Sequence, residues 1–271
     1  MKNKFCLSLI AIFFVATSFG QSKLGEVACV YVTTTDLDSS AAVYDKLGFP
    51  KVASNTFPSP WAQLSDGSLL IMMRKDTKPF MGLTYYASDV DNTASKLEKE
   101  GIAFVQKPSS GDPIKRYYIK TPDGFDIMLV ENLGGFTQPQ GTTLLTMQQK
   151  DYMSADKYPN KQCGAFGEFC HPVEDLEKSL AYWQKLGFTV KAKMAQPYPH
   201  AILSDGLMII GLHQTKDFNY PAITYFGINS GKRIQELKDQ GVKGLADFMG
   251  KDNNVLKTWE GQHFFIFSLG M

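Results

Sequence analysis

Glu168 is the residue whose type and position most suggest chemistry in this 271-residue chain. It lies inside Phe166–Cys170, an apolar run typical of a β-strand. A carboxylate in such a run costs free energy unless it is paired or hydrated. A functional interpretation makes Glu168 a cation contact or a general base with a raised pKa. The alternative is a solvated carboxylate at the open end of a sheet, hydrated or paired with His263.

The motifs of several large enzyme classes are absent from the sequence. It contains no nucleophile elbow, phosphate loop, Cys-x-x-Cys pair or His-Glu-x-x-His helix. The 28 basic and 27 acidic residues give a formal net charge of +1. This balance gives no electrostatic reason to expect a nucleic acid or an anionic membrane surface as partner.

The N-terminal residues are typical of a cleaved export signal. Lys2 and Lys4 precede an apolar stretch over residues 5–16, and Ser18 and Gly20 place small residues before a cut ahead of Gln21. The apolar stretch is short for a membrane span, although an uncleaved anchor remains the alternative. We therefore expect a signal peptide over residues 1–20 and a periplasmic or secreted protein with no membrane contact after cleavage.

Three cysteines remain after removal of the signal, and this odd number excludes a complete disulfide framework. Cys29 and Cys170 lie in alternating apolar runs, which predicts small buried side chains. A bridge that involves Cys163 remains an alternative.

The most regular feature of the chain is a duplication with a spacing of 139 residues between Asp36 and Asp175. An Asp-Leu pair, a Leu-Gly-Phe triplet and a Leu-Ser-Asp-Gly turn occur at 36–37, 47–49 and 64–67, and again at 175–176, 186–188 and 203–206. A Pro-x-Pro-x-Ala segment recurs at 58–62 and 197–201. A period this long indicates two whole domains rather than stacked short repeats.

Each copy predicts a strand, a helix and three strands, and then the same series again. In the first copy the strands are expected at 27–33, 51–56, 61–64, 69–73, 82–87, 103–106, 116–120 and 126–130, and the helices at 36–47 and 90–100. In the second copy the strands are expected at 166–170, near 190 and 201, and at 208–212, 223–227 and 264–267, with helices at 174–186 and 232–240. The predicted domains are residues 25–133 and 163–271, joined by a linker over residues 134–162 that is long enough to pack on a domain face.

This pattern resembles the vicinal oxygen chelate superfamily, because Asp-Leu-x-x-Ser-x-x-x-Tyr/Trp-x-x-Leu-Gly-Phe follows the first strand of each domain. The resemblance implies an α+β fold in which four βαβββ modules pair into two glyoxalase-like domains with cup-shaped mixed sheets. The group includes glyoxalase I, extradiol dioxygenases, fosfomycin-resistance enzymes and bleomycin-binding proteins. The fold alone therefore does not decide the function.

The resemblance also identifies positions where catalytic members hold a divalent metal with His, Gln and Glu. In the first domain these positions carry Cys29, Met72, Gly82 and Met128, and in the second domain Glu168, Gly211, Ala222 and Phe265. Gly and Ala bring no donor, and a thioether binds such ions poorly. We therefore predict that the family metal site is missing from both domains, with no metal and no cofactor. An irregular site of Glu168 with His263, joined by His200 or His213, is the alternative.

Alternation along the strands then predicts which side chains face each cup. The predicted ligand-binding residues are Tyr31, Trp61, Tyr86 and Asp126 in the first cup, and Glu168, Phe226, His263 and Phe265 in the second. This composition is typical of a pocket for an organic molecule, although the same side chains can fill a collapsed core.

The sequence thus predicts an exported protein of the glyoxalase/bleomycin-resistance type that binds a small organic molecule. One alternative is a divergent lyase, isomerase or dioxygenase that uses Glu168 or a rearranged metal site. Another is a scaffold whose sheets serve only protein contacts.

Overall fold

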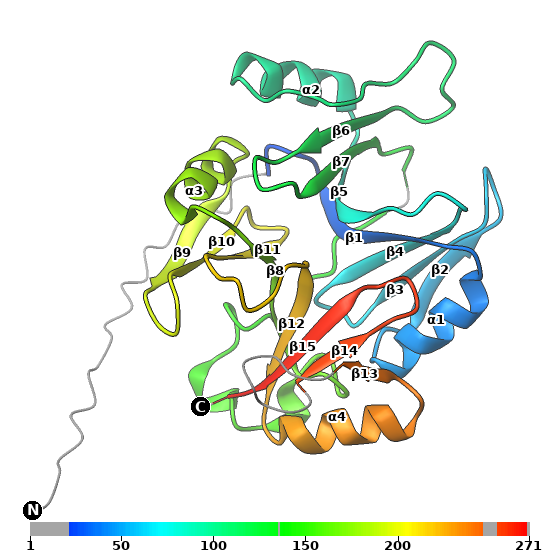
Figure 1. The fold of residues 1–271 in the computed structure, drawn as a ribbon. Helices are drawn as coiled ribbons and strands as arrows, with labels where there is room; N and C mark the ends of the chain where they lie inside the picture. Colours follow the sequence, from blue (N-terminus) through cyan, green and yellow to red (C-terminus); the bar gives the residue numbers. More distant parts are fainter. Residues whose placement is uncertain (1–21, 135, 246–253, 270–271) are drawn as a thin grey trace, which may run out of the picture.

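The computed structural model describes residues 22–134, 136–245 and 254–269, which form two mixed β-sheets with four α-helices (Figure 1). The predicted signal peptide over residues 1–20 lies outside the described residues. Among the helices of the described part, none has the length and hydrophobicity needed to cross a bilayer.

The first sheet has seven strands in the order β2-β3-β4-β1-β5-β7-β6. Its elements are β1 (Val27–Thr34), α1 (Leu37–Lys46), β2 (Lys51–Asn55), β3 (Trp61–Ser65), β4 (Leu70–Lys75), β5 (Met81–Ala87), α2 (Val90–Lys99), β6 (Arg116–Lys120) and β7 (Asp126–Glu131). Strand β1 pairs in parallel with β4 and antiparallel with β5, so the two modules of the domain join along their first strands.

The second sheet repeats this plan with eight strands in the order β13-β14-β15-β12-β8-β11-β10-β9. Its elements are β8 (Ala165–Pro172), α3 (Leu176–Lys185), β9 (Thr189–Met194), β10 (His200–Ser204), β11 (Ile209–His213), β12 (Ala222–Gly227), α4 (Ser230–Asp239), β13 (Lys243–Leu245), β14 (Val255–Lys257) and β15 (His263–Ser268). The predicted duplicated α+β architecture is confirmed. One predicted strand is wrong, because residues 103–106 form only the single bridge Gln106–Tyr118.

Local sequence signals explain where the helices begin and end. Asp36, Asp89 and Asp175 each cap a helix by accepting a hydrogen bond from the backbone N–H three residues later. Gly48 and Gly187 follow two of the helices with φ of 85° and 95°, a conformation that favours glycine.

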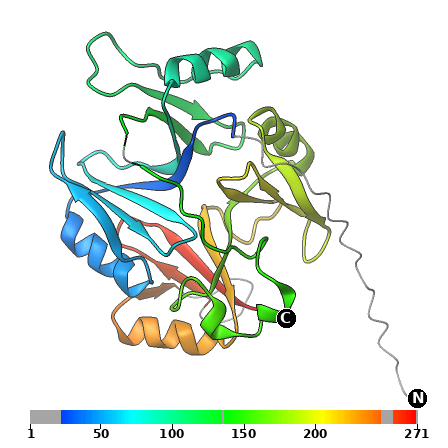
Figure 2. The ribbon, with the colours of Figure 1, turned by 180° about the vertical axis from the view of Figure 1, so that it is seen from behind.

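The helix-covered faces of the two sheets pack against each other and form one shared core (Figures 1 and 2). Phe49 of the first domain lies edge-on to Tyr225 and Phe264 of the second, with ring centroids 6.1 and 6.0 Å apart. Phe125 contacts Phe169 at 5.4 Å in the same way. The first module therefore packs on the fourth, and the second on the third.

The two repeated Ser-Asp-Gly turns join the domains. In each turn one Asp oxygen accepts two hydrogen bonds from the turn backbone, and the other oxygen accepts a tyrosine hydroxyl from the opposite domain. Tyr225 donates to Asp66, and Tyr85 donates to Asp205 at 2.7 Å. Burial raises the pKa of Asp66, while the hydrogen bond from Tyr225 opposes the rise.

The linker lies across both domains. The side-chain oxygen of Gln138 accepts a hydrogen bond from the Ala28 backbone at 2.8 Å, and its nitrogen donates to the Leu207 carbonyl at 3.1 Å. Further along, Asn160 donates to the Leu47 carbonyl. These contacts fix the linker between the two sheets.

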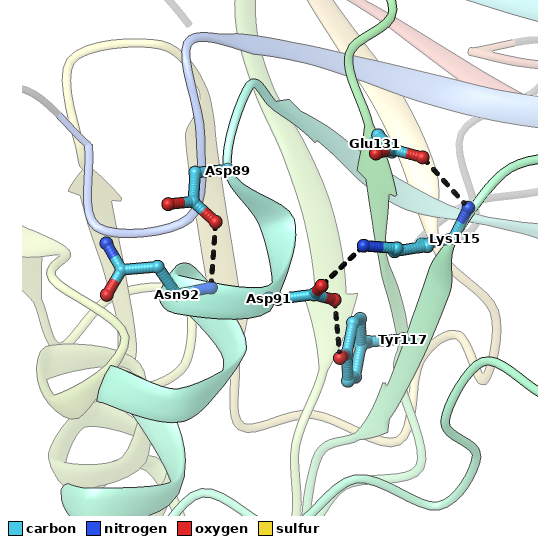
Figure 3. Close-up of polar contacts among 6 residues, drawn as sticks. All are labelled: Asp89, Asp91, Asn92, Lys115, Tyr117 and Glu131. Carbon is cyan, nitrogen blue, oxygen red and sulfur yellow. Dashed lines mark hydrogen bonds and ion pairs between the residues drawn. The ribbon is translucent and has the colours of Figure 1, made fainter.

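Exposed polar contacts hold α2 against β6 at the edge of the first sheet (Figure 3). Asp91 accepts from Lys115 and from the Tyr117 hydroxyl, the latter at 2.9 Å. The hydrogen bond from Lys115 lowers the pKa of Asp91. Because these groups are exposed, the ion pair orients the helix and contributes little to stability.

Candidate functional site

Each sheet also has a concave face that lies away from the shared core. In the first domain this face, the first cup, carries the buried side chains of Val27, Cys29, Tyr31, Leu70, Met72, Tyr86, Met128 and Val130. In the second domain the face around Glu168, Cys170 and Phe265 is the second cup.

The first cup is filled by the chain's own side chains. Phe136 of the linker inserts between Trp61 and Tyr86, with ring centroids 5.6 and 4.7 Å away. Tyr31, Trp61 and Tyr86, which the sequence predicts as binding residues, belong to this apolar cluster, and Phe136 packs on the rings of Trp61 and Tyr86. The fourth predicted residue, Asp126, pairs with Lys120 at 2.7 Å at the partly exposed end of β7.

The family metal positions of the first cup do not fit a metal ion. Cys29, Met72 and Met128 share the apolar cluster, and burial raises the pKa of the Cys29 thiol. A Cβ at Gly82 would lie 2.6 Å from the Asp126 carbonyl oxygen, so this position has no room for a ligand side chain. A hard cation would find no set of nitrogen or oxygen donors here.

The second cup contains a buried carboxylate–imidazole pair. His213 Nε2 donates to Glu168 Oε1 at 2.9 Å, and the two residues are only 8% and 4% exposed. The other carboxylate oxygen, Oε2, has no hydrogen-bond partner among the described residues. Glu168 therefore pairs with His213, and the sequence interpretation that paired it with His263 is not what the structure shows.

Gly211 makes this pair possible. A Cβ at Gly211 would lie 1.9 Å from Glu168 Oε2 and 2.7 Å from His213 Nε2, distances at which atoms overlap. Gly211 is opposite Cys170 in the β8–β11 register, between the strand positions of Glu168 and His213. Because Gly211 has no side chain, Glu168 and His213 can meet in the space above its backbone.

Two more potential donors adjoin the pair. Cys170, 1% exposed, brings its Sγ to a position where it, Glu168 and His213 offer donor atoms within 4.8 Å of one another. Burial raises the pKa of the Cys170 thiol, and the Glu168 charge raises it further. His200 stacks on His213 with centroids 5.2 Å apart and ring planes 8° apart, and its Nδ1 donates to the Tyr198 carbonyl at 2.8 Å.

Aromatic rings from two loops cover these polar groups. Tyr198 and Phe218 contact the His213 ring at 5.7 and 5.8 Å, and Phe218 also contacts Phe265 at 5.3 Å. These loop residues were missed by the sequence interpretation. Tyr198 is the variable residue within the repeated Pro-x-Pro segment, which was the available signal.

The remaining predicted residues form the rest of the second cup. Phe226 packs on Phe267 at 5.9 Å, and Phe267 on Phe265 at 5.7 Å. His263 stacks on Tyr220 with centroids 3.6 Å apart. Burial, together with the nearby positive charge of Lys257, lowers the pKa of His263 to about 4.

The family metal set does not fit the second cup either. Glu168 is its single donor, because Gly211, Ala222 and Phe265 have none. Thr224 pairs with Glu168 on one neighbouring strand and with Phe265 on the other, so the family positions of Glu168 and Phe265 do lie close together in the sheet. The family site is therefore missing because the side chains at these positions lack donor atoms, and not because the positions lie apart.

Comparison of the two copies locates the change. At a spacing of 139 residues, the second copy has Glu168, Cys170, His200, Gly211 and His213 where the first has Cys29, Tyr31, Trp61, Met72 and Arg74. All five differences fall on one patch of adjoining strands β8, β11 and β10. The second domain thus carries a cluster of polar donors at a place where the first is mostly apolar.

No protein-family model and no curated protein sequence matches the chain. Solved structures do match its fold at low sequence identity. Homoprotocatechuate 2,3-dioxygenase from Arthrobacter globiformis is similar over 91% of this chain and 80% of its own, with 16% identity and a TM-score of 0.53. The Mn(II)-bound glyoxalase from Novosphingobium aromaticivorans matches over 91% and 83%, with 14% identity and a TM-score of 0.54.

The 2,3-dioxygenase LapB from Pseudomonas sp. KL28 matches over 92% of this chain and 94% of its own, with 10% identity and a TM-score of 0.55. Such likeness establishes the arrangement of strands and helices, whereas the activities belong to those proteins. The chain has the vicinal oxygen chelate fold, duplicated into two domains.

Proposed function

We propose that the second cup binds a small organic molecule and that Glu168 is the polar group that orients it. The observation that carries this proposal is the buried Oε2 atom, which has no hydrogen-bond partner within the described part of the chain. An unsatisfied buried carboxylate oxygen costs about 1–3 kcal/mol or more. A ligand that donates a hydrogen bond to Oε2 would remove this cost.

The surroundings indicate the class of ligand. Phe218 contacts the His213 ring, and the rings of Tyr220 and Phe265 pack on Phe218 and on each other. This aromatic cluster beside the polar pair suits a flat or apolar body that carries an amine, hydroxyl or amide N–H. Tyr198 and Tyr220 lie on the loops between β9 and β10 and between β11 and β12, and both are only partly buried. Movement of these two loops would admit the ligand.

The proposal assigns no ligand to the first cup. Phe136 occupies the space beside Trp61 and Tyr86 that a ligand would need. The binding residues are accordingly those of the second cup, without the family metal set.

The test is a thermal-shift screen of chelator-treated protein against a fragment library of aromatic amines, phenols and amides. Fragments that raise the unfolding temperature are then titrated into wild type, Glu168→Gln and the control Asp126→Asn. Loss of a charged hydrogen-bond partner predicts roughly ten- to a hundredfold weaker binding in Glu168→Gln, with no change in the control. Equal affinities for all three proteins, or no saturable binder in the library, would contradict the proposal.

A second candidate function is catalysis by a divergent lyase, isomerase or dioxygenase. The observation in its favour is the 2.9 Å hydrogen bond between His213 and Glu168, because a hydrogen-bonded buried carboxylate with one free oxygen has the form of a general base. Small enolisable ketones incubated with the protein in deuterated water provide the test. Deuterium incorporation above the rate of Glu168→Gln supports catalysis, and equal rates oppose it.

We further propose that the chain is exported and cleaved near Gly20, on the basis of the residue pattern of the first twenty positions. Intact-mass measurement of protein from its native host tests this. Retention of Met1, or recovery only with membranes, would indicate an anchor.

A further inference from the structure

We propose that Glu168, Cys170 and His213 form a binding site for Zn²⁺ or a similar borderline divalent ion, in which Glu168 is the one family position and Cys170 and His213 are donors outside the family metal set. Cys170 and His213 each lie two residues along the strand from a family position, on the same face of the sheet. The site goes beyond the proposed function, because it concerns an ion rather than the organic ligand.

The donor types are those that zinc prefers. A thiolate, an imidazole and a carboxylate together make a mixed sulfur, nitrogen and oxygen set, and Zn²⁺ accepts all three. Three protein donors also leave the fourth tetrahedral position open, as in zinc sites that bind a further small ligand. That position would face the aromatic side chains of the second cup.

The distances are close to what coordination requires. Donor atoms around a tetrahedral zinc lie about 3.3–3.8 Å apart, given metal–ligand bonds of about 2.0–2.3 Å. Here all three donor atoms lie within 4.8 Å of one another, and Glu168 Oε1 and His213 Nε2 are 2.9 Å apart. To bind one ion, the Oε1–Nε2 pair would therefore have to open by about 0.4–0.9 Å, and the more distant donor atoms would have to approach by at most about 1–1.5 Å.

The carboxylate oxygen that Glu168 leaves without a partner supports the same conclusion. Glu168 Oε2 is buried and has no hydrogen-bond partner among the described residues. Glu168 is itself more than nine-tenths buried and directed into the space over Gly211. A buried carboxylate oxygen without a hydrogen-bond partner is rare in a folded protein, and a bound cation would provide the missing partner.

The first cup provides an internal control. At the matching positions it has Cys29, Tyr31 and Arg74, where a guanidinium replaces the imidazole and a thiol replaces the carboxylate. Met72 stands at the position of Gly211, so a side chain fills the space that Gly211 leaves open in the second cup. We therefore expect one ion per chain.

The experiment is a Co²⁺ and Zn²⁺ titration of the purified protein after treatment with a chelator. We expect one equivalent of Zn²⁺ by calorimetry, and a sulfur-to-cobalt charge-transfer band with Co²⁺. Cys170→Ser should lose that band. Removal even of groups that only support a ligand lowers metal affinity by about 10- to 100-fold, so Cys170→Ser and Glu168→Gln should each lose at least that much.

Two further variants keep the test decisive if a ligand substitution disturbs folding. Cys163→Ser retains a hydroxyl that can donate to the Leu47 carbonyl as the thiol does, and it should keep both the band and the affinity. Gly211→Ala retains all three donors but fills the space between them, and it should abolish binding. A wild-type protein that binds neither ion, or a band that survives in Cys170→Ser, would overturn the proposal. The organic-ligand proposal is measured on metal-free protein and stands or falls separately.

Discussion

The substitution Gly211→Ala separates a local polar pair from ordinary strand packing. In an unconstrained strand, replacing Gly by Ala raises the free energy of unfolding of the protein by about 0.5–1 kcal/mol, because Ala makes the unfolded chain less flexible. At this position, however, the new Cβ would lie 1.9 Å from Glu168 Oε2 and 2.7 Å from His213 Nε2. The carboxylate must then move away, and the buried pair breaks.

The expected magnitude follows from these two opposing effects. Loss of a buried hydrogen bond to a charged group costs about 1.5–3 kcal/mol, so the free energy of unfolding should fall by about 1–2 kcal/mol in Gly211→Ala. In a Glu168→Ala background the clashing carboxylate is gone, but the Cβ still lies 2.7 Å from His213 Nε2. This remaining contact offsets the gain of about 0.5–1 kcal/mol, so the same substitution should change stability by less than about 0.5 kcal/mol. The double-mutant cycle should therefore give a coupling energy of roughly 2 kcal/mol.

Urea unfolding of the four proteins measures this coupling. Gly231→Ala is the matched control, because nothing lies within 4 Å of its Cβ and it sits in the first turn of α4. It should raise the stability by about 0.5–1 kcal/mol in both backgrounds. If Gly211→Ala had the same effect with and without Glu168, the pair would not depend on the space at Gly211, and the reasoning would be refuted.

Three further predictions concern the supporting structure. Tyr85→Phe and Tyr225→Phe should each lower the free energy of unfolding by about 1.5–3 kcal/mol in urea, because each removes the tyrosine donor of a buried Asp oxygen. Tyr85→Phe should lie at the low end, since Ser22 still donates to Asp205 at 2.6 Å, whereas Asp66 keeps only a longer bond of 3.3 Å from Asn160. Phe136→Ala should lower the free energy of unfolding by about 1–2 kcal/mol, less than truncation of a fully buried Phe, because Phe136 is only partly buried. It should also shift the fluorescence of Trp61 to the red as water enters the first cup. An unchanged spectrum would mean that Phe136 does not fill this cup. His263 binds its proton less readily in the folded protein, where its pKa is about 4, than in the unfolded chain, where it is 6.5. The contribution of His263 to the free energy of unfolding is therefore present above pH 6.5 and is lost as the pH falls toward 4. His263→Gln should remove on the order of 1–2 kcal/mol of that pH dependence after allowance for solvent screening, and an identical slope in wild type and variant would contradict the burial of a neutral imidazole.

Periodicity and the internal repeat predicted the sheets and most of the strand faces. Alternation along β8 places Glu168 and Cys170 on one face, and the structure has both in the second cup. The prediction that Cys29 and Cys170 are buried is confirmed. These features depend on local pattern, because the side-chain period of a strand is two.

The partner of Glu168 could not be predicted in this way. His213 was weighed beside His200 and His263, and the choice depends on how far each side chain leans along its strand. The missing Cβ of Gly211 decides it, and the sequence alone gives no measure of that space.

Contacts between distant segments were also beyond the sequence pattern. The linker has little periodicity, so the insertion of Phe136 into the first cup left no signal. The Ser-Asp-Gly sequence predicts only a local turn, yet Asp66 and Asp205 also accept tyrosine hydroxyls from the opposite domain. Both contacts depend on how the two domains dock.

We infer that the second cup, with Glu168 and His213 at its centre, is the functional site. The chain has four histidines, and three of them, His200, His213 and His263, lie in this cup, whereas His171 packs on Phe125 at 4.8 Å in the shared core. The most direct measurement is therefore an NMR titration of ¹³Cε1-histidine-labelled protein with the strongest fragment from the thermal-shift screen. We predict saturable shifts of the His213 and His200 resonances, assigned by His→Asn variants, while the His171 resonance stays in place. Saturable binding that leaves His213 and His200 unmoved would place the ligand elsewhere and contradict the account.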